Sequence, residues 1–128
     1  MTREELNELS ATILHAAIAV HKLMGPGLLE SIYQQCLMRE LGLRGILVEK
    51  SVVVSLVYKG ETLNKDYIID ILVEGEIVLE LKSVEGILPV HEAQMISYLK
   101  LADKRLGFLI NFNVPLLKDG FRRFVNNF

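Results

Sequence analysis

The spacing of apolar residues predicts two helices at the start of the chain. Residues 3–23 carry apolar side chains at three- and four-residue steps, and Thr2 with Glu5 can form a capping box in front of them. The sequence Gly-Pro-Gly then interrupts the pattern. It resumes over 28–41, where Gly42 is expected to end the second helix.

From residue 48 onward the apolar period shortens to two, which is typical of strands. Four stretches rich in apolar and β-branched residues are predicted strands: 48–58, 66–73, 76–83 and 105–112. A third helical pattern over 91–103 lies before the last of them, and the amphipathic segment 116–128 has no assigned type. This order predicts an α/β fold in one domain over 1–128: a mixed four-stranded sheet flanked by helices, with an extra N-terminal helix.

Residues 67–82 form a predicted hairpin with charges in an apolar setting. Its odd positions are apolar on both strands: Tyr67, Ile69, Ile71, Val73, Ile77, Leu79 and Leu81. Burying both sets on one face requires an odd-length connection, and a three-residue loop ending at a left-handed Gly75 supplies one. The even positions then share the other face, which brings Asp70, Glu80 and Lys82 together.

These three charges allow two interpretations. A cross-strand ion pair is common in hairpins and accounts for one acid and one base. Two facing carboxylates repel each other unless a cation lies between them, and Mg²⁺ or Mn²⁺ prefers carboxylate oxygens and water. An adjacent lysine can then orient water or stabilise charge on a phosphate. The spacing alone leaves the ion pair and the metal site evenly balanced.

Composition and charge narrow the class of protein. The formal charge of −2 gives no strongly basic surface, and the basic pairs Lys104–Arg105 and Arg122–Arg123 are expected on a solvated surface. No apolar run approaches the ~20 residues of a membrane span, and the charged N-terminal residues do not resemble a secretory signal. We therefore expect a cytoplasmic protein without a membrane partner. The single cysteine, Cys36, is expected to be a small buried hydrophobe.

The chain resembles the PD-(D/E)XK nuclease superfamily, and within it the small bacterial GxxExxY proteins. The αβββαβ core of that superfamily, a restriction-endonuclease-like fold, corresponds in order to residues 28–112. Its D…E-x-K motif falls on Asp70, Glu80 and Lys82. Ile69 stands where the motif carries a proline, which is a frequent departure.

Two further motifs extend the resemblance. "GLLESIY" is similar to the GxxExxY signature through Gly27, Glu30 and Tyr33. "QMISY" is similar to the Q-x-x-x-Y motif of RecB-type members through Gln94 and Tyr98. Without the resemblance, a favourable helix dipole explains Glu30, and an ordinary half-exposed helical pair explains the glutamine and tyrosine. A histidine at a helix start, His91, is expected to be structural.

The resemblance implies a metal-dependent nuclease acting on DNA or RNA. Asp70 and Glu80 would hold Mg²⁺ or Mn²⁺, with Glu30 as a direct or water-mediated ligand. Lys82 would orient the attacking water and offset negative charge, supported by two α-helical side chains, Gln94 and Tyr98. The alternative is a catalytically silent module of the same fold that binds nucleic acid or a protein partner. The acidic pI favours that alternative, and the retained acids and lysine oppose it.

A homodimer is also expected. The chain is small and rich in apolar residues, and a fold with one active site often needs a second subunit to grip a duplex. Symmetric pairs are the commonest oligomers of soluble proteins.

Overall fold

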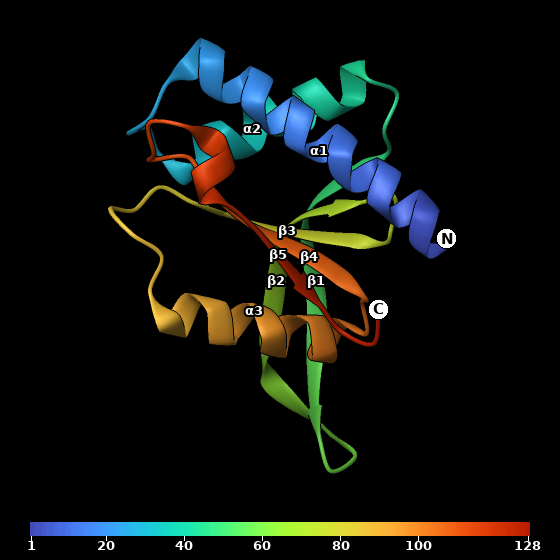
Figure 1. The fold of residues 1–128 in the computed structure, drawn as a ribbon. Coiled ribbons are helices and arrows are strands. Elements are labelled where there is room, and N and C mark those ends of the chain that lie inside the picture. The colour runs from blue at the N-terminus through green and yellow to red at the C-terminus, as the bar shows by residue number, and fades with distance from the viewer.

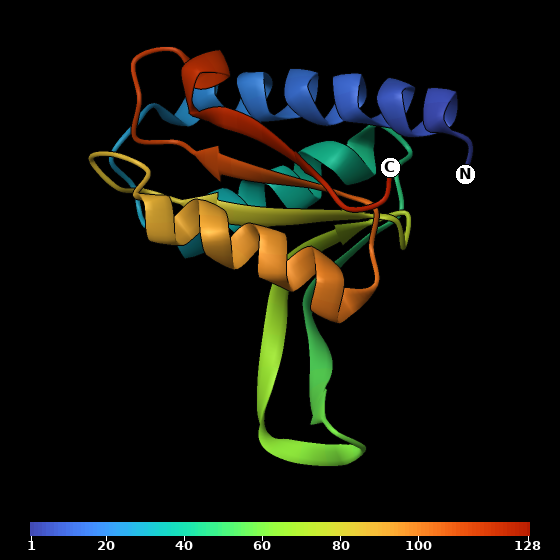
Figure 2. The ribbon, with the colours of Figure 1, turned by 60° about the horizontal axis from the view of Figure 1, so that its bottom comes forward.

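The computed structural model describes residues 1–128. Its elements are α1 (Arg3–Met24), α2 (Glu30–Leu43), β1 (Val48–Tyr58), β2 (Glu61–Val73), β3 (Ile77–Lys82), α3 (Pro89–Ala102), β4 (Leu106–Asn111), the 3₁₀ helix η1 (Leu117–Gly120) and β5 (Phe121–Val125). The five strands form one sheet in the order β1-β2-β3-β4-β5, in which only β3 and β4 run parallel. Helices α1 and α2 cover one face and α3 covers the other (Figures 1 and 2).

The predicted α/β class, with a mixed sheet and an extra N-terminal helix, is confirmed. The sheet has one strand more than predicted, because the C-terminal segment forms η1 and then β5, which pairs antiparallel with β4. A five-residue strand containing Arg122 and Arg123 is too short to show a clear period of two. None of the helices has the length and apolar character needed to cross a membrane.

Two helix boundaries differ from the prediction. Helix α2 starts at Glu30 and continues through Gly42, because the glycine that takes a positive φ, of 76°, is Gly45. Helix α3 starts at Pro89, in the first turn, where a proline loses no hydrogen bond. The N–H of Leu88 donates to Nδ1 of His91 at 3.0 Å, so this histidine caps the helix.

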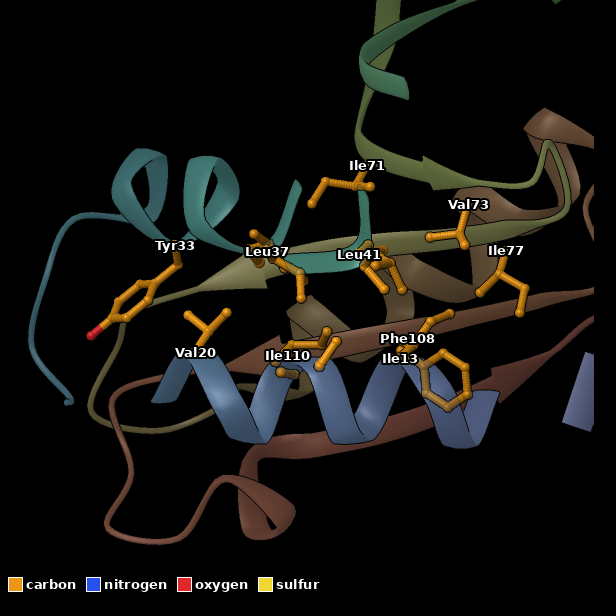
Figure 3. Close-up of a cluster of buried hydrophobic side chains, with 14 of the residues drawn as sticks. Ile13, Val20, Tyr33, Leu37, Leu41, Ile71, Val73, Ile77, Phe108 and Ile110 are labelled. Atoms are coloured by element: carbon orange, nitrogen blue, oxygen red, sulfur yellow. The ribbon is translucent and has the colours of Figure 1, made fainter. Parts of the chain in front are cut away.

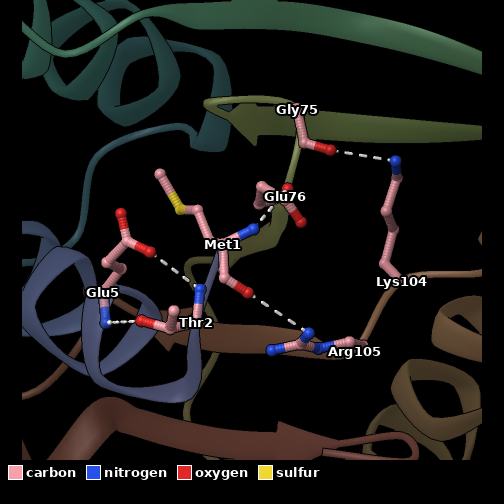
Figure 4. A network of polar contacts seen from close by, with 7 residues as sticks. All are labelled: Met1, Thr2, Glu5, Gly75, Glu76, Lys104 and Arg105. Atoms are coloured by element: carbon pink, nitrogen blue, oxygen red, sulfur yellow. Dashed lines mark hydrogen bonds and ion pairs between the residues drawn. The ribbon is translucent and has the colours of Figure 1, made fainter.

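The predicted capping box of α1 is confirmed. Glu5 N–H donates to Thr2 Oγ1 at 3.1 Å, and Thr2 N–H donates to Glu5 Oε1 at 2.9 Å (Figure 4). Further polar contacts join the N-terminus, the β2–β3 loop and the start of β4: Met1 N with Glu76 Oε1 at 3.6 Å, Lys104 Nζ with Gly75 O at 2.9 Å, and Arg105 Nη1 with Met1 O at 3.3 Å. The basic pair Lys104–Arg105 thus makes intramolecular contacts at the end of the sheet.

Two apolar clusters lie on opposite faces of the sheet. The large cluster has 19 buried residues and fills the space between α1, α2 and the sheet (Figure 3). Cys36 was expected to be buried, but it is only half-buried against this cluster. The small cluster lies under α3 and consists of Tyr67, Ile69, Leu72, Val78, Met95 and Leu99.

The sequence predicted that all odd residues of β2 face the same side of the sheet, and this is wrong for residues 67–69. Ile71 and Val73 join the large cluster as expected, but Tyr67 and Ile69 join the small cluster under α3. The change occurs at Asp70. There the β1–β2 pairing passes from Lys50↔Ile71 to Val52↔Ile69, and the intervening Ser51 has φ 52°. A bend at this point turns odd residues on its two sides toward opposite faces.

The β2–β3 connection has three residues, as the hairpin argument required. It spans Glu74–Glu76, because Val73 pairs with Ile77, so Gly75 is its middle residue and not its last. Strand β2 pairs with β3 only from Ile71 onward, so most of the β1–β2 hairpin extends beyond the sheet (Figures 1 and 2).

Candidate functional site

Glu80 is a buried acid in the middle of the sheet. Its side chain belongs to β3, which has a neighbour on each side, and it is 8% exposed. The hydroxyl of Tyr67 donates a hydrogen bond to Glu80 Oε1. The Tyr67 ring stacks on Tyr98 of α3, with ring centroids 3.8 Å apart and an interplanar angle of 12°.

The sequence reasoning missed Tyr67 because it assigned all odd positions to one apolar core. The available signal was its hydroxyl, because a buried tyrosine normally finds a hydrogen-bond partner. The bend at Asp70 turns this residue to the face that carries Glu80.

Asp70 is fixed at the bend of β2 by two hydrogen bonds. Its Oδ2 accepts from the N–H of Leu81 at 2.8 Å, and its backbone carbonyl accepts from Gln34 Nε2 at 2.8 Å. Since β2 turns away from β3 here, the carboxylate takes the place of the strand carbonyl that Leu81 would otherwise use. Asp70 is therefore held between α2 and the end of β3.

Burial, and then the negative charge of Asp70, raise the pKa of Glu80 to about 8. The hydrogen bond from Tyr67 and the positive charge of Lys82 act in the opposite direction. Burial and the charge of Glu80 also raise the pKa of Tyr67 and of Tyr98. Glu80 is thus mostly protonated at neutral pH in the absence of a cation, and a bound cation would favour its ionised form.

A hollow between β3, β4 and α3 brings several of the predicted site residues together. It is lined by Glu80, Lys82, His91, Gln94, Met95, Tyr98 and Leu109. Gln94 is exposed, and Lys82 and Tyr98 are half-buried. The structure has no ion pair between Lys82 and either Asp70 or Glu80, so the hairpin lacks the contact on which the ion-pair interpretation depends.

Glu30 lies at the exposed first residue of α2. Its Oε2 accepts from the N–H of Ser83 at 3.4 Å, directly after the end of β3. Together with Ser31, Gln34, Asp70 and Leu81, it lines a second hollow of about 290 Å³. The structure therefore places Glu30 beside Asp70 but in a different hollow from Glu80.

Tyr33, the last residue of the GxxExxY-like stretch, has a structural role. Its hydroxyl donates to the carbonyl of Gly25 and accepts from the N–H of Leu28 at 3.1 Å. Its ring stacks on Phe112, with centroids 4.3 Å apart. These contacts fix the loop that precedes α2, and so they determine where Glu30 lies.

The donor set suits a hard divalent cation only if water completes it. No group of three His, Cys, Asp or Glu side chains is arranged to hold a metal ion. Asp70 and Glu80 do provide two carboxylates, and burial, followed by the negative charge of Asp70, raises the pKa of Glu80. Mg²⁺ keeps several waters and binds through one or two carboxylates, so this pair fits it.

The comparisons with known proteins identify a family. A family model described as the PD-(D/E)XK nuclease superfamily matches residues 7–124. The searches against curated proteins and against solved structures gave no significant match. The matched range contains all the residues that line the two hollows.

Proposed function

Because this chain belongs to the PD-(D/E)XK nuclease superfamily, we propose that it is a metal-dependent nuclease that hydrolyses phosphodiester bonds in DNA or RNA. The observation that carries the proposal is the buried carboxylate of Glu80, which has a raised pKa, the charge of Asp70 close by and Lys82 in the same hollow. A structural salt bridge would not leave Glu80 in this state.

In this proposal Asp70 and Glu80 would hold Mg²⁺ or Mn²⁺, with Glu30 as a direct or water-mediated ligand. Such an ion would supply positive charge for activating water and offsetting charge on the phosphate. Lys82 shares the hollow with Glu80, so its ammonium orients the attacking water and stabilises negative charge that develops on the phosphate. Tyr67 holds the Glu80 carboxylate in place through its hydrogen bond.

The side chains of α3 form the opposite wall of the site. Gln94 and Tyr98 are one helical turn apart and line the same hollow as Lys82. Gln94 is exposed, and its amide supports the lysine or a phosphate oxygen. Tyr98 supports Tyr67 by stacking on its ring. We also infer that the chain is a GxxExxY protein, since Tyr33 fixes the loop that positions Glu30.

The nucleic acid strand would approach along α2. A hollow of about 440 Å³ is lined by Ser31, Ile32, Gln34, Gln35, Met38 and Lys50. It shares Ser31 and Gln34 with the hollow that contains Asp70. Amides, a hydroxyl and one lysine beside the carboxylates suit the polar backbone and bases of a nucleotide.

The test is a cleavage assay on single- and double-stranded DNA and RNA with Mg²⁺, Mn²⁺ or EDTA. Wild type should cleave at least one substrate with metal and none with EDTA. Asp70→Asn, Glu80→Gln and Lys82→Ala should each abolish cleavage. The matched surface variants Glu8→Gln and Lys118→Ala should leave it unchanged.

Two results would contradict the nuclease proposal. Cleavage that persists in Lys82→Ala would assign the activity to another site or to a contaminant. Binding of nucleic acid without cleavage under any metal would favour the catalytically silent module of the same fold.

A further inference from the structure

The outer edge of β1 has no backbone partner. The sheet ends at β1, and no backbone hydrogen bond outside the regular elements involves residues 48–58. An exposed edge strand presents a row of unpaired N–H and C=O groups to which another strand can bind. This edge is therefore a potential site for a partner strand.

Between Val52 and Tyr58, after the left-handed Ser51, the edge also lacks the features that usually prevent strand pairing. Residues 51–58, Ser-Val-Val-Val-Ser-Leu-Val-Tyr, contain no charge and no proline. The hairpin does have an irregularity, since the pairing shifts from Ser55↔Asp66 to Val57↔Thr62. The additional residues of that shift belong to β2, so β1 carries no insertion between Val52 and Tyr58.

Apolar side chains on the projecting hairpin are exposed. Val53 and Val57 are each 57% exposed and Tyr58 is 64% exposed. Ile68, which pairs with Val53 across the hairpin, is 53% exposed. Beyond the bend β2 pairs with β1 alone, and the hairpin projects away from the rest of the sheet (Figure 2). An isolated two-stranded ribbon is only marginally stable in water. A third strand would stabilise it.

The pattern of β1 is symmetric about Ser55. In an antiparallel pairing of two copies with the twofold axis at Ser55, Val53 lies opposite the partner's Val57, Val54 opposite the partner's Leu56, and Val52 opposite the partner's Tyr58. Each exposed valine thus meets an apolar side chain. Within residues 51–59 no charged residue falls opposite another, because the one charge there, Lys59, comes opposite Ser51.

We propose that β1 pairs antiparallel with β1 of a second copy of this chain about Ser55, so that one sheet runs through both copies. Charge favours a protein partner over nucleic acid. Beyond the bend, residues 52–69 carry two lysines (Lys59, Lys65) and two acids (Glu61, Asp66), so the projecting hairpin has no net charge to attract phosphates.

The first test is sedimentation of the full chain over a range of concentrations. Wild type should be a closed dimer that dissociates on dilution. Val57→Lys should weaken the dimer by about tenfold or more, because it places one charge from each copy against an apolar partner. Leu116→Lys is the matched control, since Leu116 is also 57% exposed but lies next to η1. A wild-type monomer at every concentration, an open-ended series of larger assemblies, or equal effects of the two variants would overturn the proposal.

The second test fixes the register and remains informative if the lysine variant misfolds. In a Cys36→Ser background, Ser55→Cys should form an intermolecular disulfide on mild oxidation, since a residue on the twofold axis faces itself within bonding range. Ser97→Cys, exposed on α3, is the control and should cross-link much more slowly. Equal rates for the two cysteines would overturn the register about Ser55. The outcome is independent of whether the chain cleaves nucleic acid.

Discussion

The two faces of the sheet are built from the same strands but bury different kinds of side chain. Under α1 and α2, the large cluster of 19 buried residues contains no carboxylate and no lysine. Under α3, only six buried apolar residues accompany the acid Glu80 and the half-buried Lys82. Strand β3 shows this contrast in successive residues, with Leu79 and Leu81 toward the large cluster and Val78 in the small one.

This contrast separates stability from chemistry. Apolar burial supplies most of the free energy of folding, so the large cluster carries the fold. The small cluster holds α3 close to the strands, and Gly107 permits this approach. A Cβ atom there would collide with Cε of Met95 and lie 3.0 Å from Cδ2 of Leu99. The face under α3 can therefore keep a costly buried carboxylate because the opposite face compensates for it.

The largest expected effect comes from Glu80, on the face under α3. Its ionisation should lower the free energy of unfolding as the pH rises. The folded-state pKa of about 8 lies above the ordinary value of 4.5. This carboxyl therefore contributes stability that is fully present below pH 4.5 and is lost as the pH rises to about 8. The loss amounts to about 5 kcal/mol at most. Urea denaturation of wild type and Glu80→Gln in EDTA across this range measures it.

The variant should remove most of this pH dependence, because glutamine does not ionise. Glu8→Gln, on an exposed position of α1, is the control and should follow wild type. Parallel stability curves for wild type and Glu80→Gln would show that Glu80 ionises in the folded state as freely as in the unfolded chain.

A truncation on the other face should cost about 2–5 kcal/mol at every pH. Leu37 is fully buried in the large cluster, so Leu37→Ala leaves a cavity there. Leu47→Ala removes the same atoms from a side chain that is 65% exposed and should change stability by less than about 0.5 kcal/mol. The affinity of the remaining folded protein for metal should be unchanged. An equal loss of metal affinity in Leu37→Ala would show that the two faces are not independent.

Periodicity was sufficient to predict the order of the elements and to bring Glu80 and Lys82 onto one face. It was not sufficient at the bend of β2. Tyr67 and Ile69 are apolar odd residues like Ile71, and only the left-handed Ser51 in the neighbouring strand marks the change of face. A bend of this kind depends on the pairing of two strands, which a one-dimensional pattern does not contain.

Divalent metal should raise the stability of wild type by about 1–3 kcal/mol at concentrations well above its dissociation constant. A metal held by Asp70 and Glu80, as proposed, would bind the folded site and not the unfolded chain, and its charge would favour the ionised form of Glu80. Asp70→Asn and Glu80→Gln should lose this gain, while Lys82→Ala should keep it because it removes no ligand. Melting curves with and without Mg²⁺ or Mn²⁺ test this. An unchanged wild-type curve at millimolar metal would contradict the metal site.

The smallest effect should come from a single hydroxyl. Tyr67→Phe keeps the ring that stacks on Tyr98 but removes the hydrogen bond to Glu80, so stability should fall by about 1 kcal/mol. That bond lowers the pKa of Glu80, so its loss should move the pH-dependent transition to higher pH and weaken metal binding. Tyr98→Phe is the matched control, because the Tyr98 hydroxyl makes no hydrogen bond within the protein. If both variants shift the transition equally, the effect belongs to the stacked rings and not to the contact between Tyr67 and Glu80.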